Sequence, residues 1–231
     1  MSMHKITPGV SLLSDTGRML SKDPYDLNSE LRDKILERDD QTCQYCGFQA
    51  ERYQGVNFIG KDAASASDKD YLTACIFCQQ SFQLDRIPFM QSGAVVWLPE
   101  IGQAALNHIA RAIYIARITQ GPLAEAARDA LDILMARKEE ASHRLGTDDP
   151  RILASVLQDF LEAKEYRLRA KKLKGFRVLP LDRRIIREGD LEFNQFPQIL
   201  AYWRSKNGPF GEMPPREWAK LFFDTKKQLS E

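Results

Sequence analysis

Apolar residues recur every three or four positions through much of the second half of the chain, a spacing that predicts helices. Two such segments, 101–116 and 123–135, are separated by Gly121 and Pro122, so the sequence predicts a helical hairpin. We expect one face of the first helix to carry Ile101, Ala105, His108, Ala112 and Ala116, and one face of the second to carry Leu123, Ala127, Ala130, Leu131, Leu134 and Met135.

The next segment, residues 148–168, predicts one continuous helix. Asp149 is placed to cap its N-terminus and Pro150 suits its first position. Apolar residues then follow at helical spacing from Ile152 to Leu161.

Gly175 and Pro180 interrupt this pattern, and two shorter helices are expected after them. The first follows Pro197 and ends near Gly208. The second begins at Pro214 and Pro215 and carries Trp218, Leu221 and Phe222.

The first 98 residues have a different pattern. Residues 1–26 are polar with interspersed glycine and proline, which indicates an arm that lies on another part of the molecule or is mobile. A short helix is expected from Asn28, followed by a β-hairpin from residues 56–59 and 71–72 and an extended segment at 94–98. The predicted organisation is an arm (1–26), a metal-binding module (27–98) and a helical subdomain packed on it (99–231).

Composition places the chain among ordinary globular proteins. It has 231 residues, 43% of them hydrophobic, and a formal net charge of +1. No stretch approaches the ~18 consecutive apolar residues of a membrane span, and the apolar run near the N-terminus is too short for a signal peptide. We therefore expect a cytoplasmic protein, whose thiols stay reduced and available to a metal.

The four cysteines are the strongest chemical signal in the sequence. Cys43 and Cys46 form one Cys-x-x-Cys pair, and Cys75 and Cys78 form a second after 28 intervening residues. Two such pairs complete a tetrahedral shell of four thiolates, which is typical of one structural zinc ion. A dithiol redox motif or simple buried cysteines are the alternatives, but no βαβ pattern surrounds either pair.

The string LRDKILERDDQTCQYCGF resembles the start of HNH-family endonuclease domains, over about residues 28–90. The resemblance implies a ββα-metal, treble-clef-like zinc module, and hence an α+β, mostly helical protein. The family's catalytic Asp-His pair corresponds here to Asn57 and Phe58, its Asn to about Tyr71, and its following His to Gln79. Phenylalanine cannot take a proton from water, so we expect no catalytic residues at these positions.

The whole chain, including the C-terminal stretch FNQFPQILAYWRSKNGPFGEMPPREWAKLFF, resembles the IcmJ (DotN) family of bacterial type IVB secretion systems. The resemblance implies a non-enzymatic subunit of the coupling complex at the cytoplasmic side of the inner membrane. Its implied partners are the coupling ATPase DotL, DotM and the IcmS-IcmW adaptor, in a complex that recruits effector proteins for export. Membrane association would then be indirect, through these partners.

Local charge and aromatic content add two expectations. Residues 22–90 hold 8 basic and 12 acidic side chains, a net charge that repels a phosphate backbone, so no nucleic acid is expected as a partner. Residues 164–187 hold ten basic side chains and two acidic ones, which indicates a solvated surface, an acidic partner segment or the anionic membrane surface. Most aromatic residues after residue 170 are expected to fill a C-terminal core. Trp203 beside Arg204 and Phe222 beside Phe223 place large residues on different helix faces, so we expect some exposed apolar surface, and we hypothesise that a tail of the ATPase docks there or along the metal-binding module.

Other functions remain open from the sequence. A nuclease with a displaced site would use carboxylates such as Asp62, Asp68 or Asp70 to bind its metal. A zinc protein that binds nucleic acid would use the basic stretch. The chain has only three histidines; His108 is expected to be a satisfied core or boundary residue, whereas His4 and His143 are expected to be solvated.

Overall fold

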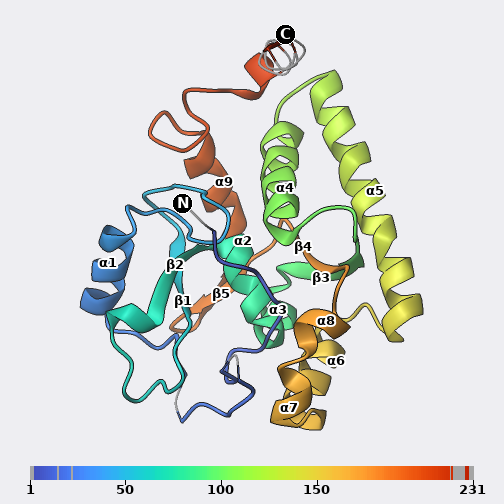
Figure 1. Ribbon diagram of the computed structural model, residues 1–231. Helices are drawn as coiled ribbons and strands as arrows, with labels where there is room; N and C mark the ends of the chain where they lie inside the picture. Colours follow the sequence, from blue (N-terminus) through green and yellow to red (C-terminus); the bar gives the residue numbers. More distant parts are fainter. Residues whose placement is uncertain (1–2, 15, 22, 219, 221–226, 229–231) are drawn as a thin grey trace.

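Two long helices, α4 (Gln103–Arg117) and α5 (Pro122–Leu145), form the predicted hairpin. The computed structural model describes residues 3–14, 16–21, 23–218, 220 and 227–228 (Figure 1). Gly121 adopts a φ of +80° directly before α5, and Gly146 adopts a φ of +75° where this helix ends. Both turns thus use glycine where a left-handed backbone is needed.

The buried face of α4 differs from the predicted one. Leu106, Ala110 and Tyr114 are almost fully buried, whereas Ala105 and His108 are exposed. The prediction was wrong for Ala105 and His108, although Ala116 is buried as predicted, because α4 is apolar on most of its circumference and buries polar side chains toward the cysteines. On α5, the predicted face is confirmed for the partly or fully buried Ala127, Ala130, Leu131, Leu134 and Met135, while Leu123 remains 37% exposed.

The cysteines lie in a small unit of one helix, one hairpin and a second helix. Helix α1 (Ser29–Arg38) begins at Asn28, whose Oδ1 accepts a hydrogen bond from the amide of Leu31 at 2.8 Å. Strands β1 (Gln54–Phe58) and β2 (Tyr71–Cys75) pair antiparallel, with Val56 opposite Thr73. Helix α2 (Ile76–Gln79) follows β2 directly. The predicted helix and hairpin are therefore confirmed.

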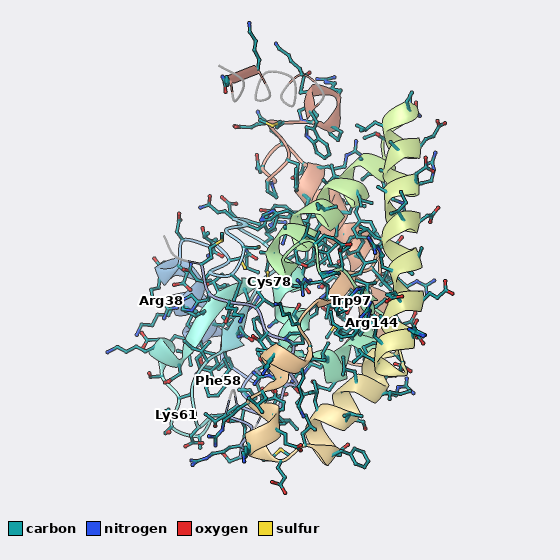
Figure 2. The ribbon with its side chains drawn as sticks, turned by 45° about the vertical axis from the view of Figure 1, so that its right-hand side comes forward. Arg38, Phe58, Lys61, Cys78, Trp97 and Arg144 are labelled. Carbon is teal, nitrogen blue, oxygen red and sulfur yellow. The ribbon has the colours of Figure 1, made fainter. Side chains whose placement is uncertain are left out.

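Short helical segments connect this unit to a second sheet. Two 3₁₀ turns, Gln80–Phe82 and Leu84–Arg86, precede α3 (Ile87–Met90). Strand β3 (Gly93–Trp97) then pairs antiparallel with β4 (Phe176–Pro180), about eighty residues later in the sequence. The side chain of Arg144 on α5 lies over the Trp97 ring, 4.2 Å from its centroid (Figure 2).

Three strands in the predicted helical subdomain were not expected. Gly175 and Pro180 flank and end β4 instead of merely separating helices. Strands β5 (Ile185–Glu188) and β6 (Leu191–Asn194) form a further hairpin, whose turn contains Gly189 at a φ of +61°. Because β3 and β4 lie on opposite sides of residue 98, one sheet crosses the boundary between the two predicted units.

The predicted continuous helix over 148–168 is wrong. Helix α6 (Pro150–Ser155) begins at Asp149 as expected, with the Arg151 amide donating to Asp149 Oδ1 at 2.7 Å. A π-helical turn, Val156–Phe160, follows it, and the chain then becomes extended at Leu161. Two short helices, α7 (Ala163–Tyr166) and α8 (Arg169–Lys172), complete the region.

Burial explains this interruption. Leu157 and Tyr166 both pack in the core that contains Val10 of the arm. A straight helix would carry Tyr166 about 13 Å along the axis from Leu157, away from that core. Helical periodicity alone could not reveal this turn, since apolar residues continue at the same spacing.

The N-terminal arm lies on the rest of the molecule, one of the two predicted arrangements. The His4 amide donates to Gln44 O, and the Gly9 amide donates to Ser81 O, both at 3.0 Å. Val10 is only 2% exposed. Figure 1 shows this segment, in dark blue, passing in front of α2 and α3.

Helix α9 (Phe196–Arg204) confirms the helix predicted after Pro197. Farther along, Pro215–Glu217 forms a 3₁₀ turn where the last helix was expected to begin, and Leu221, Phe222 and Phe223 lie outside the described residues. The largest core joins the cysteines to aromatic side chains of α2, α4 and α9, namely Phe77, Tyr114, Phe196 and Trp203. Within the described part of the chain, no helix has the length and apolarity needed to cross a bilayer.

Candidate metal centre

The first cysteine pair lies in a tight turn between α1 and β1. The Gly47 amide donates to Cys43 O at 2.8 Å, and the Cys43 amide donates to Phe48 O at 3.0 Å. Gly47 has a φ of +74°, a conformation that a side chain would strain. The glycine after the second cysteine thus lets the chain reverse and turn Cys43 and Cys46 toward the same point.

The second pair is placed by the junction between β2 and α2. Cys75 is the last residue of β2, opposite Gln54, and also precedes the first turn of α2. Its Sγ accepts a hydrogen bond from the Cys78 amide at 3.4 Å. The sulfur therefore caps the helix N-terminus, and one helical turn brings Cys78 beside it.

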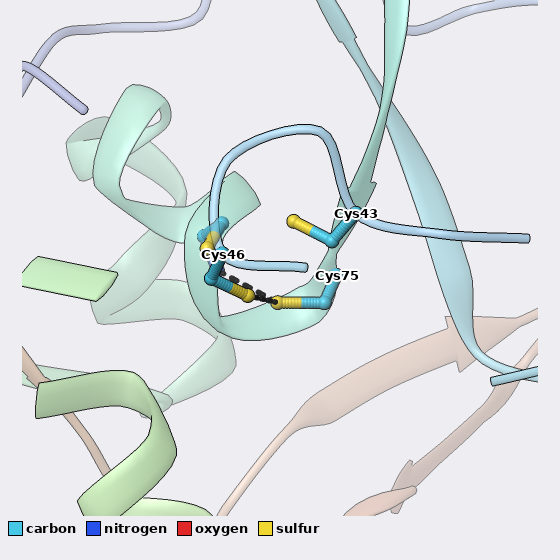
Figure 3. A group of neighbouring side chains, drawn as sticks. Cys43, Cys46 and Cys75 are labelled. Carbon is cyan, nitrogen blue, oxygen red and sulfur yellow. Dashed lines mark hydrogen bonds between the residues drawn. The ribbon is translucent and has the colours of Figure 1, made fainter. Parts of the chain in front are cut away.

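All four sulfurs converge. The Sγ atoms of Cys43, Cys46, Cys75 and Cys78 lie within 4.8 Å of one another, and all four side chains are buried. Cys46 and Cys75 point toward each other with their sulfurs 3.7 Å apart (Figure 3), much farther than the ~2.0 Å of a disulfide. Four ligands at ~2.3 Å from a central zinc would be about 3.8 Å apart. The distances between the sulfurs thus fit tetrahedral coordination of one metal ion.

A buried cation lies directly against this sulfur cluster. The Nη2 atom of Arg111 on α4 donates to Cys75 Sγ at 2.7 Å and lies 3.8 Å from Cys46 Sγ, while the residue is only 1% exposed. Its guanidinium Cζ lies 3.9 Å from the centroid of the Phe48 ring. Burial opposes the charge, yet the sulfurs of Cys75 and Cys46 raise the pKa of Arg111.

The buried Arg111 side chain indicates whether the four cysteines are neutral thiols or metal-bound thiolates. Beside four neutral thiols, Arg111 would be a buried charge without an anionic partner, at a cost of several kcal/mol. Four thiolates around a divalent ion carry a net charge of about −2, which the guanidinium partly offsets. The residues present therefore fit a metal-bound tetrathiolate better than four reduced thiols.

Further groups on α4 orient the site. Asn107 Nδ2 donates to Cys78 Sγ at 3.2 Å, and the Gln103 side chain donates to Asn107 Oδ1 at 2.9 Å. His108 Nε2 lies 2.8 Å from the backbone oxygen of Cys46. His108 is therefore a satisfied boundary residue, as expected, and not a candidate ligand in this arrangement.

Sequence reasoning missed Asn107 and Arg111, although the sequence contained a signal for them. Gln103, Asn107 and Arg111 are four residues apart in a helix whose other residues are mostly apolar, so they form one polar stripe. Figure 2 shows Cys78 in the middle of the molecule, close to this helix. A polar stripe on a buried helix indicates a polar or ionic partner inside the protein.

The positions that correspond to nuclease catalytic residues have structural contacts. Asn57 is 3% exposed; its Oδ1 accepts from the hydroxyl of Tyr25 at 2.9 Å and its Nδ2 donates to the hydroxyl of Tyr45 at 2.7 Å. Phe58 packs on Tyr71, with ring centroids 5.3 Å apart. Gln79 Nε2 donates to the backbone oxygen of Val56 at 2.8 Å. These contacts hold the hairpin and the segments around it.

The carboxylates considered for a displaced nuclease site do not lie close enough together to share a metal ion. Asp62 accepts hydrogen bonds from Ala64 and Ser65, Asp68 pairs with Lys34 at 2.9 Å, and Asp70 accepts from the Ser67 amide at 2.9 Å. Among the described residues, the four cysteines are the one group of His, Cys, Asp or Glu close enough together to hold an ion.

Two other expectations about the surface have mixed outcomes. Trp203 is 1% exposed and packs among Phe48, Phe77 and Phe196, so it does not contribute the exposed apolar surface that was expected near it. In the basic stretch, Arg169 is 5% exposed and donates to Pro8 O. All four of its lysines, Lys164, Lys171, Lys172 and Lys174, are exposed.

Comparison with known proteins identifies the family. No protein-family model matches the chain. The type 4 apparatus protein DotN of Legionella pneumophila subsp. pneumophila (strain Philadelphia 1) is 30% identical over 151 residues, covering 64% of this chain and 70% of the relative. The chain belongs to the DotN (IcmJ) family. For this DotN family member, a fold shared with HNH endonucleases stays a prediction.

Proposed function

We propose that this DotN family member is a non-enzymatic structural subunit of a type IVB secretion coupling complex. Similarity to a protein named as part of a type 4 apparatus is the observation that carries the proposal. By the family resemblance, the subunit binds the coupling ATPase DotL, alongside DotM and the IcmS-IcmW adaptor, and helps recruit effector proteins. It would lie at the cytoplasmic face of the inner membrane through these partners.

The proposed cofactor is one structural zinc ion held by Cys43, Cys46, Cys75 and Cys78. Their mutual distances and burial, with the Arg111 guanidinium against the sulfurs, support this assignment. When bound, zinc supplies a cross-link between the first turn and the hairpin, with no open position for water or substrate. From the side of α4, Asn107 donates a hydrogen bond to the Cys78 thiolate, and Arg111 partly neutralises the thiolate charge.

The residues at the positions of the nuclease catalytic groups support a non-enzymatic role. Asn57 is engaged by two tyrosine hydroxyls, and Phe58 provides no group that accepts a proton. Asp62, Asp68 and Asp70 stabilise their own loop and its contact with α1. A scaffold role requires only that these segments keep their shape.

Affinity purification of the tagged protein from its own bacterium, in mild detergent, tests this proposal. Co-purifying proteins are identified by mass spectrometry, and zinc is measured in the same sample. We expect the coupling ATPase in stoichiometric amount and about one zinc per chain. Recovery of nucleic acid without that ATPase, or magnesium-dependent nicking of plasmid DNA by the purified chain, would overturn the scaffold assignment.

A further inference from the structure

A groove with a volume of about 740 Å³ lies between the N-terminal arm and the segment that leads from α8 into β4. Arm residues 3–8 form one side, and Lys171 and Lys174 lie on the other. The start of α4, including Ala104, lines a further part. The Arg169 side chain donates to Pro8 O at 3.0 Å and so ties the arm to α8 at one end of the groove.

The lining of this groove is basic. Lys5, Lys171, Lys174 and Arg177 line it together with His4, and no aspartate or glutamate does. Among the described residues, no carboxylate forms an ion pair with Lys5, Lys171 or Lys174. The positive charges on both sides therefore face a shared concave space and lack an anionic partner there, which favours an acidic occupant.

The groove also offers apolar surface between these charges. Ile6 and Pro8 of the arm, Leu173 and Phe176 of the opposite side, and Ala104 of α4 line it. A ligand that carries only negative charge would leave this surface in contact with water. An occupant with both acidic and apolar side chains matches the lining better.

The arm contributes unpaired backbone groups as well. Within residues 3–9, the backbone amides of His4 and Gly9 donate hydrogen bonds to the body. Within the described part of the chain, the amides of Lys5, Ile6 and Thr7 between them donate to no protein group. Such a segment can hydrogen-bond to the main chain of an extended peptide laid beside it.

We propose that this groove binds an extended, acidic peptide segment of a partner protein, whose carboxylates pair with Lys5, Lys171 and Lys174 and whose apolar side chains contact the lining. The inference rests on the proposed scaffold function, for which it names the docking surface and the chemistry of the bound segment. A flat anionic membrane could contact the lysines but could not fill a recess lined by the arm backbone.

Peptide selection on the full-length chain tests the proposal without the secretion complex. Phage displaying random peptides about a dozen residues long are selected on the immobilised protein, and synthetic versions of the enriched peptides are measured by fluorescence anisotropy. We expect enriched sequences to be acidic with interspersed apolar residues. Lys171→Glu combined with Lys174→Glu should weaken their affinity about tenfold or more, because two attractive pairs become repulsive.

The matched control is Lys164→Glu with Arg183→Glu. Both residues are exposed members of the basic stretch outside the groove, so the control changes net charge equally. It should retain binding to within about twofold. Ala170→Trp, which fills the groove from an exposed position without changing charge, should also abolish peptide binding.

Three results would overturn the inference. Enriched peptides could lack acidic bias, or bind the groove and control variants equally. Alternatively, phosphatidylserine vesicles could bind in a groove-dependent manner while no acidic peptide competes, which would assign the lysines to the membrane. Co-purification of the coupling ATPase is measured separately, so a wild-type chain that recovers the ATPase but selects no acidic peptide at this groove would reject this surface and leave the proposed function standing.

Discussion

The Nη2 atom of Arg111 donates to Cys75 Sγ at 2.7 Å, which places a fully buried cation in direct contact with the sulfur cluster. Arg111→Ala removes the cation that partly neutralises the thiolates. Breaking one side of a buried charge pair costs about 3–5 kcal/mol, so we expect a correspondingly lower free energy of unfolding. Zinc release to a chromogenic chelator should also become faster, since the thiolates would lose a hydrogen-bond donor.

Arg117 on the same helix provides the control. It pairs with Asp182 at 3.2 Å near the surface, so Arg117→Ala should change stability by less than about 1 kcal/mol and leave zinc release unchanged. Equal zinc release from the wild-type protein and from Arg111→Ala would contradict a role for Arg111 at the metal centre.

Cys75→Ser is expected to remove the metal and unfold at least the first 90 residues. One lost thiolate leaves the other three without a closed shell. Unfolding should also reach α4 and α9, because the cysteines share a core with Ile113 of α4 and Trp203 of α9. Zinc content, circular dichroism and amide hydrogen exchange check this result. A soluble, metal-free variant with an unchanged melting temperature would refute it.

Trp203→Ala should destabilise the protein by about 3–5 kcal/mol, as large aromatic-to-alanine changes in a core do. Trp203 is 1% exposed and contacts the rings of Phe48, Phe77 and Phe196. Phe160→Ala serves as the comparison, since Phe160 is 76% exposed and should change stability by about 0.5 kcal/mol or less. Urea denaturation of both variants measures the difference, and a small effect at Trp203 would contradict its placement in the core.

Asp39 makes the hairpin sensitive to acid. Its carboxylate accepts from Arg38 Nε at 2.8 Å and from the Thr73 amide at 2.8 Å, linking the end of α1 to β2. Burial opposes the Asp39 charge, but the hydrogen bonds from Arg38 and Thr73 outweigh it and hold the pKa below its usual value. The resulting stabilisation is fully present above the unfolded-state pKa of about 3.9 and is lost as pH falls through the lower folded-state value.

Asp39→Asn tests this dependence. At neutral pH the variant should be less stable than wild type by about 1–2 kcal/mol, because hydrogen bonds to a charged acceptor become bonds to a neutral one. The difference should shrink below about pH 4, where the wild-type carboxyl takes up a proton. Denaturation of both proteins across this range, with their metal content measured at each pH, checks this expectation. A difference that does not change with pH would rule out the carboxylate as its source.

Local signals in the sequence predicted that the four cysteines come together. The Cys-x-x-Cys spacing, the Asn28 cap and the two short apolar segments of the hairpin depend only on residues close in sequence, so they can be recognised without knowledge of the fold. The β3–β4 pair was missed because its strands are far apart in sequence. Gly175 and Pro180, which flank or end β4, are typical of a linker and so hid the strand between them. Trp203 was misassigned because adjacent large residues cannot reveal which of them faces the core.

The cysteines are synthesised well before the aromatic residues of α9 that help to bury them. All four cysteines have been made once residue 78 is added, whereas Trp203, which packs against Phe48 and Phe77 next to the cluster, comes much later. During translation the thiols are therefore accessible to an ion until α4 and then α9 pack against this part of the chain. In the finished protein the same sulfurs are almost fully buried, so an ion bound at that stage would exchange only when this part of the core opens.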